Sequence, residues 1–73
     1  MMDVESKLSI LEDIMDIDKG KINEDTILSE IEEWDSMAVM ALIAITDDNF
    51  HKKVTKDNLK SFKTINDILV FWE

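Results

Sequence analysis

The chain has 73 residues, of which 17 are acidic and 8 are basic, and its formal net charge is -9. It contains no cysteine and one histidine, which excludes disulfide staples, thiolate zinc sites, a cysteine nucleophile and any multi-histidine metal site. The acidic balance opposes binding to nucleic acid or to an anionic membrane. A hydrophobic content of 45% is too high for a disordered acidic tail. The length predicts a single domain over residues 1–73.

The charge is distributed unevenly along the chain. Residues 1–50 contain 14 acids and 3 lysines, whereas residues 51–73 contain 3 acids and 5 lysines. A partner steered by charge would therefore be basic and would meet the first two thirds of the chain. Solubility alone explains an acidic balance equally well, and charge does not decide between the two.

No targeting or membrane-spanning segment is apparent. The N-terminal residues Met1 to Glu5 lack both the basic start and the apolar run of a signal peptide. The longest apolar run, Met37 to Ile45, has nine residues. It would form a helix of about 13.5 Å, far shorter than the roughly 30 Å hydrocarbon core of a bilayer. We expect a cytoplasmic protein with no membrane insertion.

Residues 3–16 are predicted to form an amphipathic helix. Its apolar residues recur at spacings of 4, 3 and 4, which is the period of one helix face: Val4, Leu8, Leu11 and Met15. Asp3 and Glu5 lie in the first turn, where the helix dipole favours negative charge. Gly20, the only glycine, is expected in a turn beyond the helix end.

Residues 17–34 form a long connection without regular periodicity. Connections longer than about 12–15 residues are uncommon in a compact domain and are usually functional or disordered. Because apolar residues recur through this one, we expect it to be pinned to the core, with a short helical turn near residues 27–31. These residues are Ile17, Ile22, Ile27, Leu28, Ile31 and Trp34.

Residues 36–49 are predicted to form the second helix. Asp35 and Ser36 precede a run of good helix formers, and either can cap the helix through a side-chain oxygen. The helix is apolar nearly all round. A core stripe is expected at Val39, Leu42, Ile43, Thr46 and Phe50.

Two shorter helices are expected after it. Thr55 is expected to cap a short helix that runs through Leu59 to Phe62, and a capping-box variant at residues 64–67 opens a last helix from Ile65 to Trp72. No sustained alternation and no hairpin turn indicate a strand. The predicted fold is therefore all-α. It is a small four-helix bundle of three main helices and one short helix, with a long loop between the first and second helices.

The chain offers little for catalysis. A serine nucleophile needs a nearby base, and the only histidine, His51, lies fifteen residues after Ser36. A helix of about 20 Å separates the two, so they are expected at its opposite ends. The paired acids Glu32-Glu33 and Asp47-Asp48 lack the alternating ligands of a cation-binding loop. We expect no enzyme activity and no metal site.

One candidate site is left after catalysis and metal binding are excluded. It is the segment Asp35-Ser36-Met37, at the junction of the long loop and the second helix. A helix cap explains it fully. A serine at this position is also exposed, and free amides at a helix start suit a phosphate, although Glu32, Glu33 and Asp35 would oppose that charge.

With this segment the chain resembles the acyl carrier proteins, of the phosphopantetheine-binding carrier superfamily, over nearly its whole length. Asp35-Ser36-Met37 matches the family's Asp-Ser-Leu or Asp-Ser-Met motif at the start of the second helix, after a long pinned loop. Phe50 closes that helix, and Val54 follows it. The apolar positions of the last two helices also match, at Leu59, Phe62, Ile65 and Ile68.

The resemblance implies a covalent cofactor. A transferase would move 4′-phosphopantetheine from coenzyme A onto Ser36, and the thiol of this arm would hold an acyl or aminoacyl group as a thioester. Asp35, beside the attachment site with Met37, would help the transferase recognise the site and hold its metal. We also expect a monomer that meets loading and downstream biosynthetic enzymes through basic or apolar docking surfaces on their side; the resemblance implies the basic patches.

Two departures from the family pattern refine this expectation. Many members have glycine two residues before the Asp, whereas Glu33 and Trp34 precede Asp35 here, and Trp34 either packs on the core or shields the arm. The second helix is also less acidic than in fatty-acid carriers, which favours a specialised pathway, such as aminoacyl transfer, polysaccharide modification or secondary metabolism. The predicted partner-binding residues are Trp34, Met37, Ala38, Ala41, Ile45 and Asp48.

Two alternatives stay open. The face formed by Ala38, Ala41 and Ile45 either meets a partner or packs beneath the long loop. The protein as a whole is either a carrier or an unmodified acidic helical module that binds a basic or apolar groove.

Overall fold

The computed structural model describes residues 3–73 and confirms the all-α prediction. A short 3₁₀ turn, Leu28–Glu30, interrupts the loop between the first two helices. Within the described residues there is no strand, only an isolated bridge between Ile27 and Thr64. Met1 and Met2, which entered the expectation about the N-terminus, lie outside the described residues. The four helices are α1 (Val4–Met15), α2 (Ser36–Phe50), α3 (Lys56–Ser61) and α4 (Ile65–Phe71).

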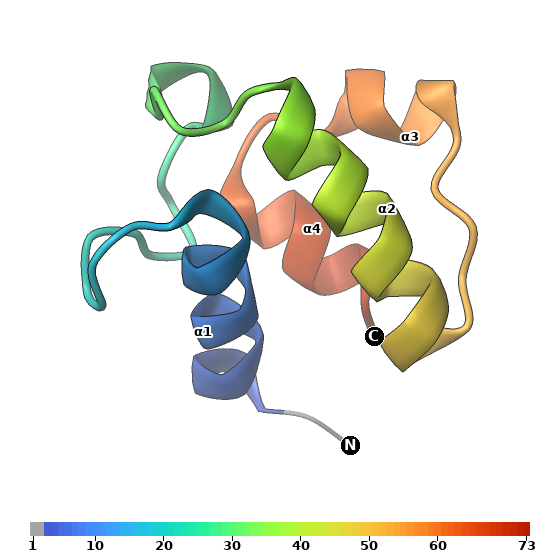
Figure 1. Cartoon of the computed structure of the whole chain (residues 1–73), viewed down its shortest axis with the longest axis horizontal. Coiled ribbons are helices and arrows are strands. Elements are labelled where there is room, and N and C mark those ends of the chain that lie inside the picture. Colours follow the sequence, from blue (N-terminus) through green and yellow to red (C-terminus); the bar gives the residue numbers. More distant parts are fainter. Residues whose placement is uncertain (1–2) are drawn as a thin grey trace.

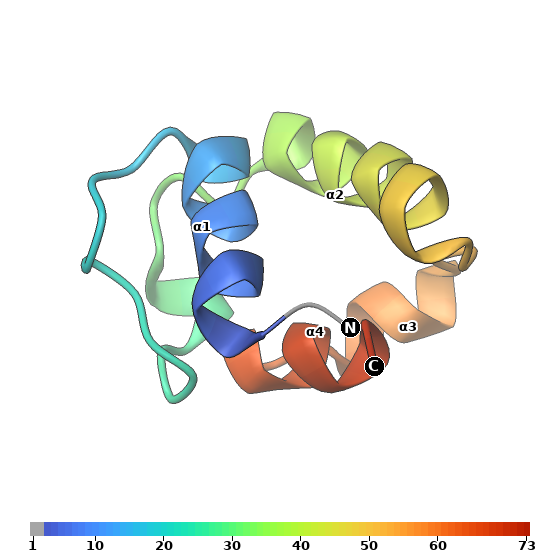
Figure 2. The ribbon, with the colours of Figure 1, turned by 90° about the horizontal axis from the view of Figure 1, so that it is seen from below.

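The helices surround one core. Helix α1 packs against α2 on one side and α4 on the other. After α2 the chain runs back along the molecule to the short α3, which leads into the start of α4 (Figures 1 and 2). All four helix bounds agree with the predicted ranges to within two residues. The buried apolar residues come from α1, the loop, α2 and the C-terminal segment: Leu11, Met15, Ile22, Leu28, Ala38, Leu42, Ile65, Ile68, Leu69 and Trp72.

The predicted core stripes are mostly correct. The apolar face of the last predicted helix is buried; it consists of Ile65, Ile68, Leu69 and Trp72. Val4 is an exception in α1, because it lies in the first turn beyond the packed helices and is 42% exposed. Ile43 is an exception in α2, with 37% of its surface exposed, since it lies beside the core stripe rather than on it.

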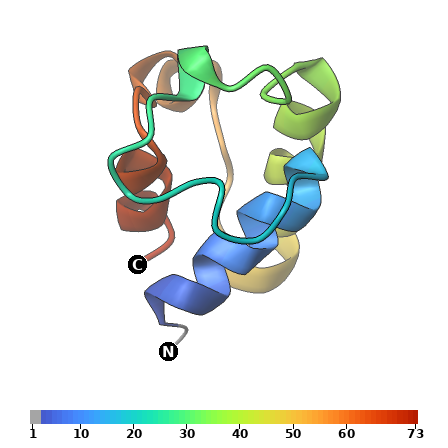
Figure 3. The same cartoon turned by 90° about the vertical axis from the view of Figure 1, so that its left-hand side faces the viewer.

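The long loop is pinned to the core through Ile22 and Leu28, as predicted, and its backbone is also bonded to the start of α4, which was not predicted. The Leu28 amide donates to the Lys63 carbonyl at 2.9 Å, and the Ile65 amide donates to the Thr26 carbonyl at 3.0 Å. Figure 3 shows the loop crossing the face of the molecule between α4 and α2. Because Ile22 and Leu28 are buried in the core, the loop contributes to folding as well as connecting two helices.

The first helix ends in a way that the sequence did not indicate. Asp16 takes the left-handed conformation (φ 54°) and closes α1, a position that usually needs glycine or asparagine. Gly20 lies in the following turn at φ 88°, as expected. The Glu12 carboxylate accepts a hydrogen bond from the Gly20 amide at 2.7 Å and so fixes the first turn of the loop to α1.

A buried aromatic contact joins the C-terminal half of α2 to the end of α4. The indole Nε1–H of Trp72 donates to the Thr46 hydroxyl at 2.8 Å, and Phe50 stacks on the Trp72 ring with centroids 4.6 Å apart. Thr46 is fully buried. The hydrogen bond satisfies two polar groups that burial would otherwise leave unpaired.

Thr46→Val is expected to destabilise the protein by about 1–3 kcal/mol, because the buried indole N–H loses its acceptor while the side-chain volume is kept. Urea unfolding followed by tryptophan fluorescence measures the loss. The double variant Thr46→Val with Trp72→Phe removes both partners, so it should be more stable than the sum of the single changes predicts. Strict additivity would show that the contact contributes nothing.

The capping box that opens α4 is confirmed. The Asp67 carboxylate accepts hydrogen bonds from the Lys63 amide at 2.8 Å and the Thr64 amide at 3.0 Å. The Lys63 amide, followed by the Thr64 amide, lowers the pKa of Asp67 below its ordinary value of 3.8. The ionised carboxylate therefore stabilises the folded chain above that value, and the contribution is lost as the pH falls through the lower folded pKa.

Asp67→Asn is expected to lower the free energy of unfolding by about 0.5–1 kcal/mol at neutral pH, because the charge that accepts both amides is gone. The gap between the two proteins should be constant above pH 5 and should close as the pH falls below 3.8. Chemical unfolding at a series of pH values checks this, with Asp57→Asn as an exposed acid of α3 for comparison. A gap that does not depend on pH would contradict the assignment.

Candidate functional site

The candidate site lies where the long loop enters α2. Asp35 is extended (φ -118°, ψ -172°), and its Oδ1 accepts a hydrogen bond from the Ala38 amide at 3.0 Å. Of the two predicted caps, Asp35 is therefore the one used. Ser36 is the first residue of the helix and is exposed. The hydroxyl of Ser36 is accessible for chemistry because the cap does not require it.

The start of α2 fits a phosphodiester on Ser36. The first amides of a helix have no acceptor within the helix, and Asp35 satisfies only that of Ala38. The amides of Ser36 and Met37, with the positive end of the helix dipole, favour a negative group on the serine oxygen. Glu32 and Glu33 precede the site and are exposed, so solvent weakens their repulsion of that charge.

Ser36 and His51 lie at opposite ends of α2, as predicted. Ser36 begins the 15-residue helix, and His51 closes it in the left-handed conformation at φ 56°. A helix of this length spans about 22 Å. His51 is therefore too far from Ser36 to serve as its base.

The predicted partner face on α2 needs correction. Ala38 is only 2% exposed, because it lies one turn before the fully buried Leu42 on the same side of the helix. Ala38 is unavailable to a partner, and its place among the predicted partner-binding residues is wrong. Ala41 and Ile45 are half-buried, so the side of α2 that they share with Ala38 packs largely against the protein.

A different face of α2 is exposed and apolar. We call it the methionine strip; it consists of Met37 (80% exposed), Met40 (69%), Ile43 (37%) and Ala44. Helical spacing places it in line with Ser36 at its start and with the exposed acids Asp47 and Asp48 at its end. Met37 and Asp48 are among the predicted partner-binding residues, whereas Met40, Ile43 and Ala44 are not. Spacings of 3 and 4 from Met37 lead to Met40 and Ala44, but Ile43 was assigned to the core stripe.

Trp34 packs against the core and is half-buried. It lines a hollow of about 230 Å³ between the loop and the start of α4, together with Ile27, Leu28, Ser29, Phe62 and Lys63. Of the two predicted roles for this side chain, packing on the core is the one observed.

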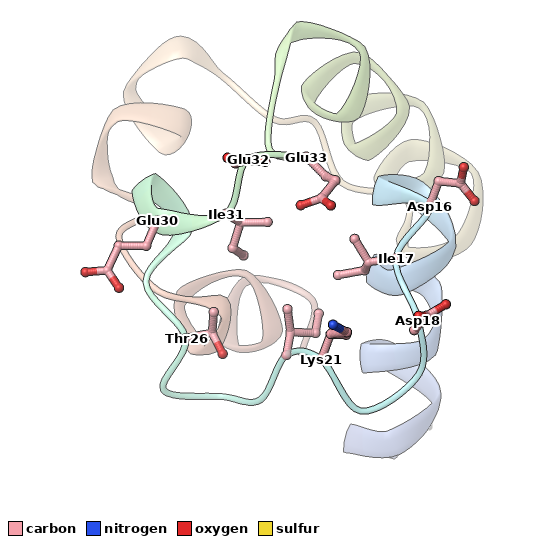
Figure 4. A pocket seen from close by; sticks show the side chains of 10 residues that line it. Asp16, Ile17, Asp18, Lys21, Thr26, Glu30, Ile31, Glu32 and Glu33 are labelled. Atoms are coloured by element: carbon pink, nitrogen blue, oxygen red, sulfur yellow. The ribbon is translucent and has the colours of Figure 1, made fainter.

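A larger hollow of about 480 Å³ opens inside the long loop. We call it the loop hollow. In Figure 4, Ile17, Ile31 and Glu33 point toward its middle, while Asp16 and Glu30 point outward. Its ten lining residues are Asp16, Ile17, Asp18, Lys21, Ile22, Thr26, Glu30, Ile31, Glu32 and Glu33.

Two further observations concern residues 3–73. Within this range no helix has the length and apolar content needed to cross a membrane. The same residues contain no group of three or more histidine, cysteine or acidic side chains arranged to hold a metal ion.

Comparison with known proteins assigns the family. No curated protein and no solved structure matches the chain. A family model described as a phosphopantetheine attachment site matches residues 8–71, which covers all of α2, α3 and α4 and most of α1. Domains of this family are carriers of 4′-phosphopantetheine without catalytic activity of their own, and they interact with transferases and biosynthetic enzymes. The chain therefore belongs to the phosphopantetheine attachment-site family of carrier domains.

Proposed function

We propose that Ser36 is the residue that carries the 4′-phosphopantetheine arm. Its hydroxyl is exposed at the first position of α2, within the matched region, and Asp35 frees it by capping the helix. In the transfer, the Ser36 oxygen bonds to the phosphorus next to the pantetheine. The phosphorus–oxygen bond to the nucleotide of coenzyme A breaks, and the nucleotide leaves with the electron pair. A base on the transferase takes the hydroxyl proton.

The chain would then serve as a carrier of acyl or aminoacyl thioesters. It contains no cysteine, so the thiol that bears the load must come from the arm. Its one histidine lies at the opposite end of α2 from Ser36, and the neighbouring Asp35 carboxylate caps the helix, so other proteins would carry out the loading and the chemistry. The carrier itself would not be an enzyme.

Enzymes that act on the arm would dock on the methionine strip. Any protein that reaches Ser36 must cover the residues around it, since a specific interface buries about 800 Å² on each partner. Met37 and Met40 are the large exposed apolar side chains nearest in sequence to Ser36. Methionine adapts its shape to the surface it meets, which suits a carrier that visits several partners.

The strip favours a specialised pathway over housekeeping fatty-acid synthesis. A carrier that docks on a basic partner would present acidic side chains along the middle of α2. Here the exposed side chains in the middle are apolar, and the acids of α2, Asp47 and Asp48, lie near its C-terminal end. Partners with an apolar docking surface are therefore favoured.

Intact mass spectrometry tests the proposal. After incubation with coenzyme A and a promiscuous transferase, the protein is expected to gain the mass of one phosphopantetheine group, and Ser36→Ala is expected to gain nothing. Ser29→Ala, which removes an exposed serine seven residues earlier, should be modified like the wild type. If the wild type stays unmodified under conditions that modify a known carrier, the chain is an unmodified interaction module instead.

A further inference from the structure

The loop hollow has the size of a small-ligand site. Its volume of about 480 Å³ falls within the range of roughly 300–1,000 Å³ that is typical of such pockets. The isoleucines Ile17, Ile22 and Ile31 provide apolar surface, and Ile22 is buried. The Glu33 carboxylate points into the hollow beside this surface, so the hollow offers an apolar contact and a charged contact to one ligand.

The charge of the hollow selects cations. Five of its lining residues are acidic and one is a lysine, which gives a net charge of -4. Asp16 and Glu30 point outward, and the Glu33 carboxylate points toward the middle of the hollow. The ion pair found among residues 3–73 is Lys53–Asp47, outside the hollow, so the five carboxylates are not neutralised by a salt bridge. A carboxylate or phosphate ligand would be repelled here, whereas an ammonium group would be attracted.

The hollow lies close to Ser36 along the chain. Glu32 and Glu33 line it and precede Ser36 by four and three residues. Since an extended chain advances at most about 3.6 Å per residue, the Glu33 Cα lies within about 11 Å of the Ser36 Cα. A group on a flexible arm at Ser36 would have a millimolar effective concentration near the hollow, enough to populate a weak site.

We propose that the loop hollow receives a cationic aminoacyl load held on the Ser36 arm. The ammonium of the load would lie beside the Glu33 carboxylate, and an apolar side chain of the load would contact Ile17 and Ile31. This inference rests on the proposed function and narrows it, because it selects aminoacyl loads over simple acyl loads. The hollow shares no residue with the methionine strip, so both can be occupied at once.

The test compares two loads that differ by one amine. Coenzyme A analogues carrying a leucyl or an isocaproyl group, each joined through a stable amide, are transferred onto Ser36, and mass spectrometry first verifies attachment. Failure to attach would count against the proposed function and is seen at this step. Two-dimensional NMR then compares the backbone amides of the two loaded proteins.

The leucyl load is expected to shift the amides of Ile17, Ile31 and Glu33, and the isocaproyl load to leave them near their positions with the bare arm. Glu33→Gln should lower the occupancy about two- to fivefold, as loss of one exposed ion pair implies, and added salt should do the same. Glu24→Gln removes an exposed acid of the same loop that does not line the hollow, so it should have no effect.

Two results would overturn the inference. One is equal shifts for both loads, which would show that the amine is not recognised. The other is that the leucyl load leaves these amides unchanged while a short arginine peptide shifts them, which would assign the hollow to a basic side chain of a partner protein.

Discussion

Replacing Leu42 by alanine is expected to remove about 2–5 kcal/mol of stability, because the truncation loses buried apolar surface and leaves a cavity in the core. Leu42 lies in the middle of α2 and is 0% exposed, within the same core cluster as residues of α1, the loop and α4. A domain of this size has about 4–11 kcal/mol in total, because stability is roughly 0.05–0.15 kcal/mol per residue. The substitution is therefore expected to remove a large fraction of the free energy of unfolding.

Urea unfolding monitored by circular dichroism measures this loss. Ile43→Ala is the matched control, because it truncates the neighbouring residue of the same helix, which is 37% exposed, and it should cost less than half as much. Equal losses for the two variants would contradict the placement of α2 against the core.

The helices and their caps were predictable because their signals are local. Thr55 and Asp67 lie within four residues of the backbone groups that they satisfy, so the order of residues identifies them. The left-handed caps at Asp16 and His51 were not predictable in the same way. Neither residue is glycine, and the packing of the whole bundle has to impose that conformation.

The exposed face of α2 could not be read from the sequence, because the helix is apolar nearly all round. Periodicity identifies a buried face only when the opposite face is polar. Here Met40 and Leu42 have similar hydrophobicity, yet Met40 is 69% exposed and Leu42 is fully buried. The positions of α1 and α4 decide between them, and this is tertiary information.

The proposed attachment site and the loop hollow also differ in how far the sequence indicates them. Ser36 could be selected as a candidate because its motif is three consecutive residues at a predicted helix start. The hollow depends on the path of the loop, which brings Ile17 opposite Ile31 and Glu33 (Figure 4). That path is fixed by hydrogen bonds to the start of α4, such as Leu28 to Lys63, which no local pattern indicates.

A charge placed on the methionine strip is expected to slow transfer of the phosphopantetheine arm. Met40→Glu is expected to lower kcat/KM for transfer of the phosphopantetheine arm about tenfold or more, mainly through KM, because a charge would be buried in an apolar contact. The side chain is 69% exposed in the free protein, so the free energy of unfolding should change by less than about 0.5 kcal/mol.

A promiscuous transferase with coenzyme A provides the assay, and mass spectrometry measures the initial rate. Met40→Leu keeps the apolar surface and should react like the wild type. Val70→Glu places the same charge on an apolar residue of α4 that is 53% exposed, and it should leave the rate within about twofold. If Met40→Glu instead reacts faster than the wild type, the partner presents basic side chains to α2, and docking there is electrostatic rather than apolar.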